Sequence, residues 1–170
     1  MLSIRKAVAV AAATLVAGGT LAAAGPASAG EVRQARVVQN VRFYNEVVNE
    51  ALDADGSSGP SSNVITWPAN GTKYQDWNLI STDRGYLIES VGKPGRCLQS
   101  PRNTSSAIVL ADCNTAVPTQ HWQLDRVGDR TVIAEARDEG LVIQATGSKQ
   151  SVLAEVANGD PRQAWDVTPS

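Results

Sequence analysis

The chain offers few side chains that could carry out catalysis. Its single histidine, His121, is accompanied by no Gly-x-Ser-x-Gly sequence or other nucleophile context, so we expect a partly exposed strand residue. Acidic residues are scattered, with no inserted segment where a pair for glycoside hydrolysis would be concentrated. Two cysteines and one histidine do not supply the four ligands of a zinc site, and no glycine-rich phosphate loop is present. We therefore expect a non-enzymatic protein without metal or cofactor.

Amide and aromatic side chains are more informative, because three of the four tryptophans occur in one repeated phrase. The phrase is Gln-x-Trp, and it recurs at separations of 45 and 43 residues, as Gln75 with Trp77, Gln120 with Trp122, and Gln163 with Trp165. Residues two apart on a strand face the same side. An indole there can bury a large apolar area, while the nearby amide satisfies backbone groups where strands bend. We interpret the phrase as a structural motif.

A repeat of this length predicts three similar units that close around a common axis. Short β-rich segments alternate with turn residues between the phrases, which indicates an all-β barrel or sandwich. No segment after the first 29 residues has a useful helical period. We predict three repeats of roughly 43–45 residues, with lobes at about 41–80, 81–126 and 127–168, preceded by a loose N-terminal arm at 30–40.

Residues 1–29 have the pattern of a cleaved signal peptide. Arg5 and Lys6 precede an apolar, alanine-rich stretch, and the small residues that end at Ala29 supply an Ala-x-Ala cleavage site, so we expect cleavage before Gly30. A membrane anchor is the alternative, but the stretch is only weakly hydrophobic. The leader holds two of the 15 basic residues and none of the 17 acidic ones, which leaves a net charge of −4. We expect a secreted, extracellular protein with no nucleic-acid or membrane partner.

The two cysteines, Cys97 and Cys113, are 16 residues apart. In an exported protein such a pair is most simply a disulfide, which would stabilise the fold by roughly 3 kcal/mol in the chain-entropy model. Alignment of the three repeats supports the pairing, because both cysteine positions are small or apolar together in the other lobes: Ala51 with Ala69, and Val142 with Ala157.

At this level of detail the chain resembles the ricin B-chain-type lectin family, which folds as a β-trefoil. The family pattern combines a Cys-Leu-Asp strand, a segment that ends in Asp-Cys-Asn, and a closing Asn-Gln-x-Trp. The second repeat reads Arg96-Cys97-Leu98-Gln99, Ala111-Asp112-Cys113-Asn114 and Thr119-Gln120-His121-Trp122. The first reads Ala51-Leu52-Asp53, Thr66-Trp67-Pro68 and Tyr74-Gln75-Asp76-Trp77. The resemblance covers about residues 41–167 and implies a β-trefoil domain at 41–168.

The resemblance also implies a sugar site, in which an aspartate, an aromatic ring and amides hold one sugar. A carboxylate accepts hydrogen bonds from neighbouring hydroxyls, a ring covers the apolar C–H face, and amides select the remaining hydroxyls. In the first lobe, these family positions hold Asp53, Trp67 and Gln75, with Tyr74 in place of the usual asparagine. Ile65 also replaces a polar residue, for which Asn63 could substitute, and Asp55 is an alternative carboxylate.

The other two lobes lack both anchors. The aspartate position holds Gln99 in the second lobe and Gln144 in the third, and the ring position holds Ala111 and Glu155. Trp67 therefore has no aromatic counterpart, which favours a surface ring that binds ligand. The competing interpretation is that Trp67 packs under the Gly- and Ser-rich loop or on the N-terminal arm. Asp53 also has a competing interpretation, as a turn residue that caps Asp55-Gly56.

The resemblance implies a carbohydrate-binding protein with one degenerate site, whose partner would be a galactose-, xylose- or glucose-type glycan. A different class of function stays open, because trefoil loops can be reused. The alternative is a protein-interaction module, such as an inhibitor of a secreted hydrolase, that keeps the fold and no sugar site.

Overall fold

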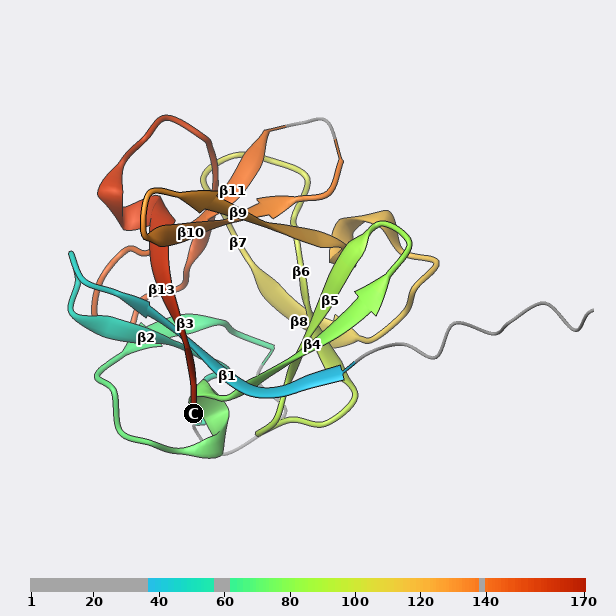
Figure 1. The fold of residues 1–170 in the computed structure, drawn as a ribbon, viewed down its shortest axis with the longest axis horizontal. Helices are drawn as coiled ribbons and strands as arrows, with labels where there is room; N and C mark the ends of the chain where they lie inside the picture. The colour runs from blue at the N-terminus through green and yellow to red at the C-terminus, as the bar shows by residue number, and fades with distance from the viewer. Residues whose placement is uncertain (1–36, 57–61, 138–139) are drawn as a thin grey trace, which may run out of the picture. The chain divides into compact units, whose positions relative to one another are not determined.

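The computed structural model describes residues 37–56, 62–137 and 140–170, whose regular structure is made of β-strands and short 3₁₀ helices (Figure 1). The leader at 1–29 and residues 30–36 of the expected arm lie outside the described residues. Strand β1 (Val37–Asn45) begins inside the segment for which the sequence suggested a loose arm. It is ordered there because it pairs with β4 (Trp77–Thr82), with Val37 opposite Ile80.

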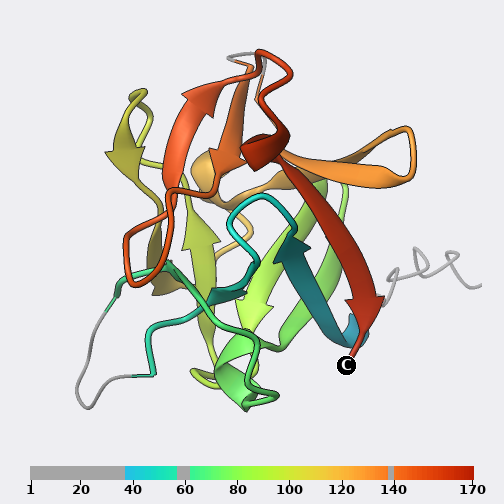
Figure 2. The same cartoon turned by 90° about the vertical axis from the view of Figure 1, so that its left-hand side faces the viewer.

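Six strands form a closed antiparallel barrel. Each pairs with the next, and the last pairs with the first, in the order β1, β4, β5 (Gly85–Ser90), β9 (Trp122–Val127), β10 (Arg130–Glu135) and β13 (Ala164–Pro169). Closure leaves no unpaired edge among these strands. Figure 2 shows where the barrel closes: the C-terminal strand β13 ends beside β1, with Val41 opposite Pro169.

Three further hairpins lie outside the barrel, one for each lobe. They are β2 (Glu50–Asp53) with β3 (Ile65–Trp67), β6 (Arg96–Gln99) with β8 (Val109–Asp112), and β11 (Leu141–Gln144) with β12 (Leu153–Val156). The short strand β7 (Ser106–Ala107) joins the second lobe to the third by pairing with β12. A six-stranded barrel with three hairpins is a β-trefoil, so the predicted fold is confirmed.

The core fills the barrel with the apolar side chains that alternate along its strands. In β10, every second residue is buried, as expected for a strand with one face turned inward. The three phrase tryptophans are the largest fully buried side chains among the described residues, and they pack with Phe43, Leu52, Ile88, Ile133 and other aliphatic residues of all three lobes. Burial of this shared core is the main stabilising contribution.

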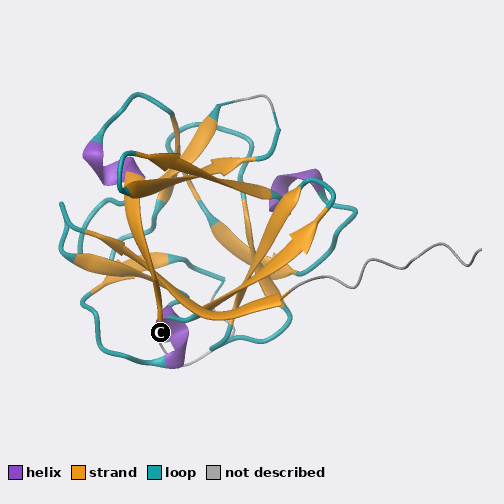
Figure 3. Ribbon diagram, viewed as in Figure 1, coloured by secondary structure: helices purple, strands orange, loops and turns teal. Residues whose placement is uncertain are grey.

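One expectation about the repeated phrase is wrong. The glutamine of each phrase does not lie on the same strand as its tryptophan, because it ends a short 3₁₀ helix that precedes the strand. These helices are η1 (Lys73–Gln75), η2 (Pro118–Gln120) and η3 (Pro161–Gln163), which Figure 3 shows well apart from one another around the strands. Proline suits the first position of η2 and η3, since it has no N–H to leave without a partner.

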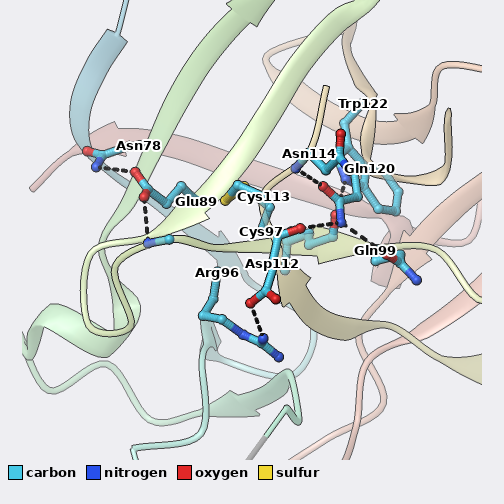
Figure 4. Close-up of a disulfide and its surroundings, with 12 residues drawn as sticks. Asn78, Glu89, Arg96, Cys97, Gln99, Asp112, Cys113, Asn114, Gln120 and Trp122 are labelled. Carbon is cyan, nitrogen blue, oxygen red and sulfur yellow. Dashed lines mark hydrogen bonds and ion pairs between the residues drawn. A yellow bond between two sulfur atoms is a disulfide. The ribbon is translucent and has the colours of Figure 1, made fainter. Parts of the chain in front are cut away.

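The expected disulfide is confirmed. Cys97 and Cys113 are bonded, with their Cα atoms 5.0 Å apart, and they tie the start of β6 to the end of the β8 segment (Figure 4). No helix among the described residues is both long and apolar enough to cross a membrane.

Candidate functional site

The glutamine of each Gln-x-Trp motif forms hydrogen bonds to the backbone of the loop that leads into the 3₁₀ helix. Gln75 is completely buried; its Nε2 donates to the carbonyl of Pro68 (3.0 Å), and its Oε1 accepts from the backbone N–H of Asn70 (2.9 Å). Two residues later, Trp77 donates its indole N–H to the carbonyl of Leu52 (3.1 Å). Both groups satisfy backbone atoms that the bending chain leaves without a partner.

The same bonds recur in the other two lobes. Gln120 bonds the carbonyl of Asp112 and the N–H of Asn114, as Figure 4 shows, and Gln163 bonds Val156 and Asn158 in the same way. The indoles of Trp122 and Trp165 donate to the carbonyls of Leu98 and Ile143, each at 3.1 Å. The phrase is therefore structural in every lobe.

The first lobe adds to these bonds a pocket of about 380 Å³ whose described lining combines carboxylate and aromatic side chains. Asp53 reaches it from the end of β2, Trp67 from the end of β3, and Tyr74 from η1. The other described lining residues are Asp55, Gly56, Ile65, Asn70 and Thr72. The structure thus brings together three of the four residues that the sequence nominated.

Gln75, the fourth, does not line the pocket among the described residues. It instead forms a side-chain hydrogen bond to Asp53, in addition to its two backbone partners. Because Gln75 is completely buried and is not among the described lining residues, its amide is not placed to select sugar hydroxyls. Gln75 is therefore a positioning residue for the Asp53 carboxylate, which lines the pocket.

Asp53 is 4% exposed, and its burial raises the pKa of the carboxyl above the ordinary value. The neighbouring Asp55 charge raises the pKa further, whereas hydrogen bonds from Gln75 and from the backbone N–H groups of Gly56 and Asp55 lower it. These donors fix the carboxylate in one orientation. It is a pre-positioned hydrogen-bond acceptor, the group a sugar diol requires.

Trp67 is partly exposed and lies in the pocket wall, so it is not a core residue. A loop of the third lobe supports the strand that carries it. The carbonyl of Thr66, next to Trp67, accepts a hydrogen bond from the backbone N–H of Lys149 (2.9 Å). The backbone N–H of Thr66 donates to the carbonyl of Gln150 (3.2 Å). The Lys149 ammonium lies 4.8 Å from the centre of the Trp67 ring, a cation–π distance.

Tyr74 is held between two glycines. A Cβ atom added at Gly56 would lie 2.6 Å from one edge of the Tyr74 ring, and a Cβ added at Gly92 would lie 2.4 Å from the other. Both distances are far below van der Waals contact, so any side chain at either position would displace the ring. The glycines therefore set the place of Tyr74 in the pocket wall.

Sequence reasoning did not nominate Asn70 and Thr72 as pocket residues. Asn70 Oδ1 accepts from the N–H and hydroxyl of Thr72 (3.0 and 2.8 Å), and this local turn brings both residues to the rim. An Asn-x-Thr sequence just before the phrase was the available signal. Asn63 is exposed and reaches Asp55 (3.4 Å), but it is not among the described lining residues, so it does not replace the family's polar residue at Ile65.

The equivalent positions of the other lobes carry different chemistry, as the sequence predicts. Gln120 Nε2 donates to Gln99 Oε1, and Gln163 Nε2 donates to Gln144 Oε1, both at 3.0 Å, so an amide stands in place of the Asp53 carboxylate. Strand register places Ala111 opposite Cys97 and Glu155 opposite Val142, as Trp67 stands opposite Ala51. Neither lobe has an aromatic ring at that position.

The third lobe has a second hollow, of about 460 Å³, at the place that the disulfide occupies in the second lobe. It lies between β10 and the β11–β12 hairpin and is lined mainly by small apolar side chains, among them Val132, Ala134, Val142 and Ala157. It does not coincide with the third-lobe equivalents of Asp53 and Trp67, because neither Gln144 nor Glu155 is among its described lining residues.

His121 is buried, which contradicts the expectation of a partly exposed residue. Its Nε2 lies 2.9 Å from the carbonyl of Thr115 and its Nδ1 lies 3.0 Å from Thr82 Oγ1, on the neighbouring β4–β5 hairpin. Both ring nitrogens are therefore used in contacts within the second lobe. Among the described residues, no group of three or more histidine, cysteine, aspartate or glutamate side chains could hold a metal ion.

Comparison with solved structures finds the same fold in proteins of low sequence identity. A designed three-fold symmetric protein, ThreeFoil, matches with a TM-score of 0.65 over 77% of this chain and 99% of its own, at 21% identity. An exo-β-1,3-galactanase from Clostridium thermocellum matches with a TM-score of 0.70 at 20% identity, over 78% of this chain but 30% of that protein. The C-terminal half of an earthworm R-type lectin, in complex with GalNAc, matches with a TM-score of 0.58 at 19% identity, over 78% of this chain and 100% of its own.

No curated protein matches the sequence. The model of one protein family does match, the ricin-type β-trefoil lectin domain, and it covers residues 39–165. The match includes all three Gln-x-Trp phrases, the disulfide and the first-lobe pocket. This chain therefore belongs to the family of ricin-type β-trefoil lectin domains.

Proposed function

We propose that the protein is a secreted, non-enzymatic lectin that binds one sugar residue in the first-lobe pocket. The observation that carries the proposal is the convergence of a fixed carboxylate, Asp53, with two aromatic rings, Trp67 and Tyr74, on one pocket. The family membership and the earthworm lectin, which was solved with GalNAc, support the same class of ligand. The residues that line the pocket supply each contact that a pyranose needs.

A single shallow site limits the affinity. We expect a Kd near millimolar for a monosaccharide, equivalent to about −4 kcal/mol. A polymeric glycan or an assembly of several copies would raise the apparent affinity through avidity. Galactose-, xylose- and glucose-based glycans are the ligands to test first.

Calorimetric titration or a glycan array tests the function. Trp67→Ala should abolish binding while the protein stays folded, because the ring is partly exposed and lies in the pocket wall. Glu155→Ala is the matched control, since Glu155 holds the same strand position in the third lobe and should leave binding unchanged. Loss of binding in both variants, or in neither, would contradict a first-lobe site.

The absence of binding to any of these glycans would remove the lectin proposal and favour the protein-interaction alternative. That alternative predicts a complex with a secreted hydrolase that survives excess free sugar. The proposed secretion has a separate test, since the exported protein should begin at or near Gly30 when its N-terminus is sequenced.

A further inference from the structure

The charged side chains that line the pocket are all acidic among the described residues. Asp53 and Asp55 both line it, and no lysine or arginine is among its described lining residues. The two carboxyl groups interact, because the charge of Asp55 raises the pKa of Asp53. A neutral sugar can accept and donate hydrogen bonds here, but it brings no charge to offset the repulsion between two carboxylates.

The aromatic walls of the pocket also attract cations, as two lysines of the protein show. The Lys149 ammonium lies 4.8 Å from the centre of the Trp67 ring, and the Lys73 ammonium lies 5.6 Å from the centre of the Tyr74 ring. Neither lysine is among the described residues that line the pocket. Each ring therefore already contacts a lysine ammonium that is not among the described lining residues. The two acidic side chains, in contrast, line the pocket.

We propose that the preferred ligand of the first-lobe pocket is an amino sugar with a free ammonium group. The ammonium binds at the Asp53 and Asp55 carboxylates, and the C–H face of the sugar ring stacks on Trp67. This inference rests on the proposed function, because it names the class of sugar that the same pocket selects. The charge-assisted hydrogen bonds to two acids are stronger than those that a neutral hydroxyl would form.

The arrangement disfavours the opposite class of charged sugar, a glycuronic acid. Its carboxylate would meet Asp53 and Asp55 inside the pocket, and only the lysines outside the lining would attract it. Lys149 therefore has opposite effects on the two classes of ligand. Removal of its charge should favour an amino sugar on Trp67 and should weaken a glycuronic acid.

The test compares three oligosaccharide sets of equal length by calorimetry: glucosamine oligomers, their N-acetylated forms, and glycuronic acid oligomers. The pH is kept below the pKa of the amine, so that the amino sugar is charged. We expect the glucosamine form to bind about tenfold more tightly than the N-acetylated form, a difference of about 1.4 kcal/mol. The preference should shrink as salt is added, because screening weakens exposed charge pairs.

Two variants locate the preference. Asp55→Asn should reduce the ratio of the two affinities to near one, and it should fold, because Asp55 has a φ of 41°, a left-handed conformation that asparagine tolerates. Glu155→Gln, which removes the same charge at the third lobe, should leave the ratio unchanged. Lys149→Met should raise the affinity for glucosamine oligomers.

Each outcome decides between the two proposals. Equal affinity for the amino and N-acetylated forms, or tighter binding of the glycuronic acid, would overturn the amino-sugar inference and leave the lectin function standing. A preference that persists in Asp55→Asn would also overturn it, since the second carboxylate would then have no part in selection. No binding of any of these oligomers would overturn the amino-sugar inference as well, whereas the lectin function itself falls only if galactose-, xylose- and glucose-based glycans also fail to bind.

Discussion

The first and second lobes share the same structural hydrogen bonds but differ in the side chains at the sugar positions. In both, a phrase glutamine fastens the loop before a 3₁₀ helix, and a buried indole donates to the carbonyl of the outer hairpin strand. The second lobe adds a disulfide and has Gln99 and Ala111 at the sugar positions. The first has no disulfide and has Asp53 and Trp67 there, in the wall of a pocket.

The difference separates the residues that hold the trefoil together from those that could bind a ligand. Side chains that repeat in all lobes bond to backbone atoms of the loops and strands that they join. Among the side chains that differ between lobes, Asp53, Trp67 and Tyr74 line the pocket, and Cys97 and Cys113 form the disulfide. Changes in the first group should therefore act on stability in any lobe, and changes in the second should act in one lobe only.

The largest expected effect is loss of a phrase tryptophan. Trp122→Ala should lower the free energy of unfolding by about 3–5 kcal/mol, because it removes a fully buried indole and leaves the carbonyl of Leu98 without its donor. Trp77→Ala should cost a similar amount, since its environment is equivalent. Urea unfolding of both variants checks this, and a clearly smaller loss in one lobe would show that the frames are not energetically equivalent.

Removal of the disulfide should have the next largest effect. The double change Cys97→Ala and Cys113→Ala should lower the free energy of unfolding by about 3 kcal/mol. The chief reason is that the unfolded chain regains the conformational freedom that the closed loop takes away. Thermal unfolding with and without reductant measures the loss. Sugar binding should be unaffected, because the bridge lies in the second lobe, and an unchanged melting temperature would contradict a stabilising role.

The third lobe offers the reverse experiment. Val142 and Ala157 match Cys97 and Cys113 in register, and the N–H of Ala157 donates to the carbonyl of Gly140 (3.0 Å) as that of Cys113 does to Gly95 (2.9 Å). The change Val142→Cys with Ala157→Cys should therefore form a disulfide, with a gain of up to about 3 kcal/mol. Mass spectrometry and thermal unfolding test both points, and a bridge that forms without raising stability would show that the second-lobe geometry does not transfer.

Much of this comparison could be predicted from the sequence, because three copies of a phrase align the lobes and so expose their differences. The fold and the Cys97–Cys113 bridge follow from that alignment, whereas Asp53, Trp67 and Tyr74 were nominated from the resemblance to the family's sugar site. The 3₁₀ helices do not, since three residues are too few to show a helical period.

Contacts between hairpins that are distant in the sequence, or that belong to different lobes, could not be predicted from the sequence either. The burial of His121 depends on Thr82, which is 39 residues away on another hairpin. Lys149 reaches Trp67 because a third-lobe loop pairs with β3. Neither partner has a spacing that repeats, so the alignment of lobes could not reveal it.

The smallest expected effect concerns the carboxyl group of Asp53, at a position where the other two lobes have glutamine. Burial raises the pKa of Asp53, so between its unfolded and folded pKa values the folded protein binds more protons than the unfolded chain. Stability due to this group therefore falls as the pH rises through that window. At neutral pH, Asp53→Asn should be more stable than the parent by under about 1 kcal/mol, and the difference should vanish in acid. The amide can keep the bond to Gln75, as Gln99 does with Gln120.

Asp160 of the third lobe provides a control of opposite sign. Its hydrogen bonds from the side chain and backbone N–H of Arg162 lower the pKa of its carboxyl, so its contribution to stability is present at neutral pH and is lost as the pH falls. Asp160→Asn should therefore be less stable than the parent at neutral pH and should approach it in acid. Urea unfolding of the three proteins from about pH 3 to pH 8 measures both slopes. Parallel stability curves for Asp53→Asn and the parent would contradict a buried, destabilising charge, whereas converging curves would show that the first lobe keeps its carboxylate at a cost in stability.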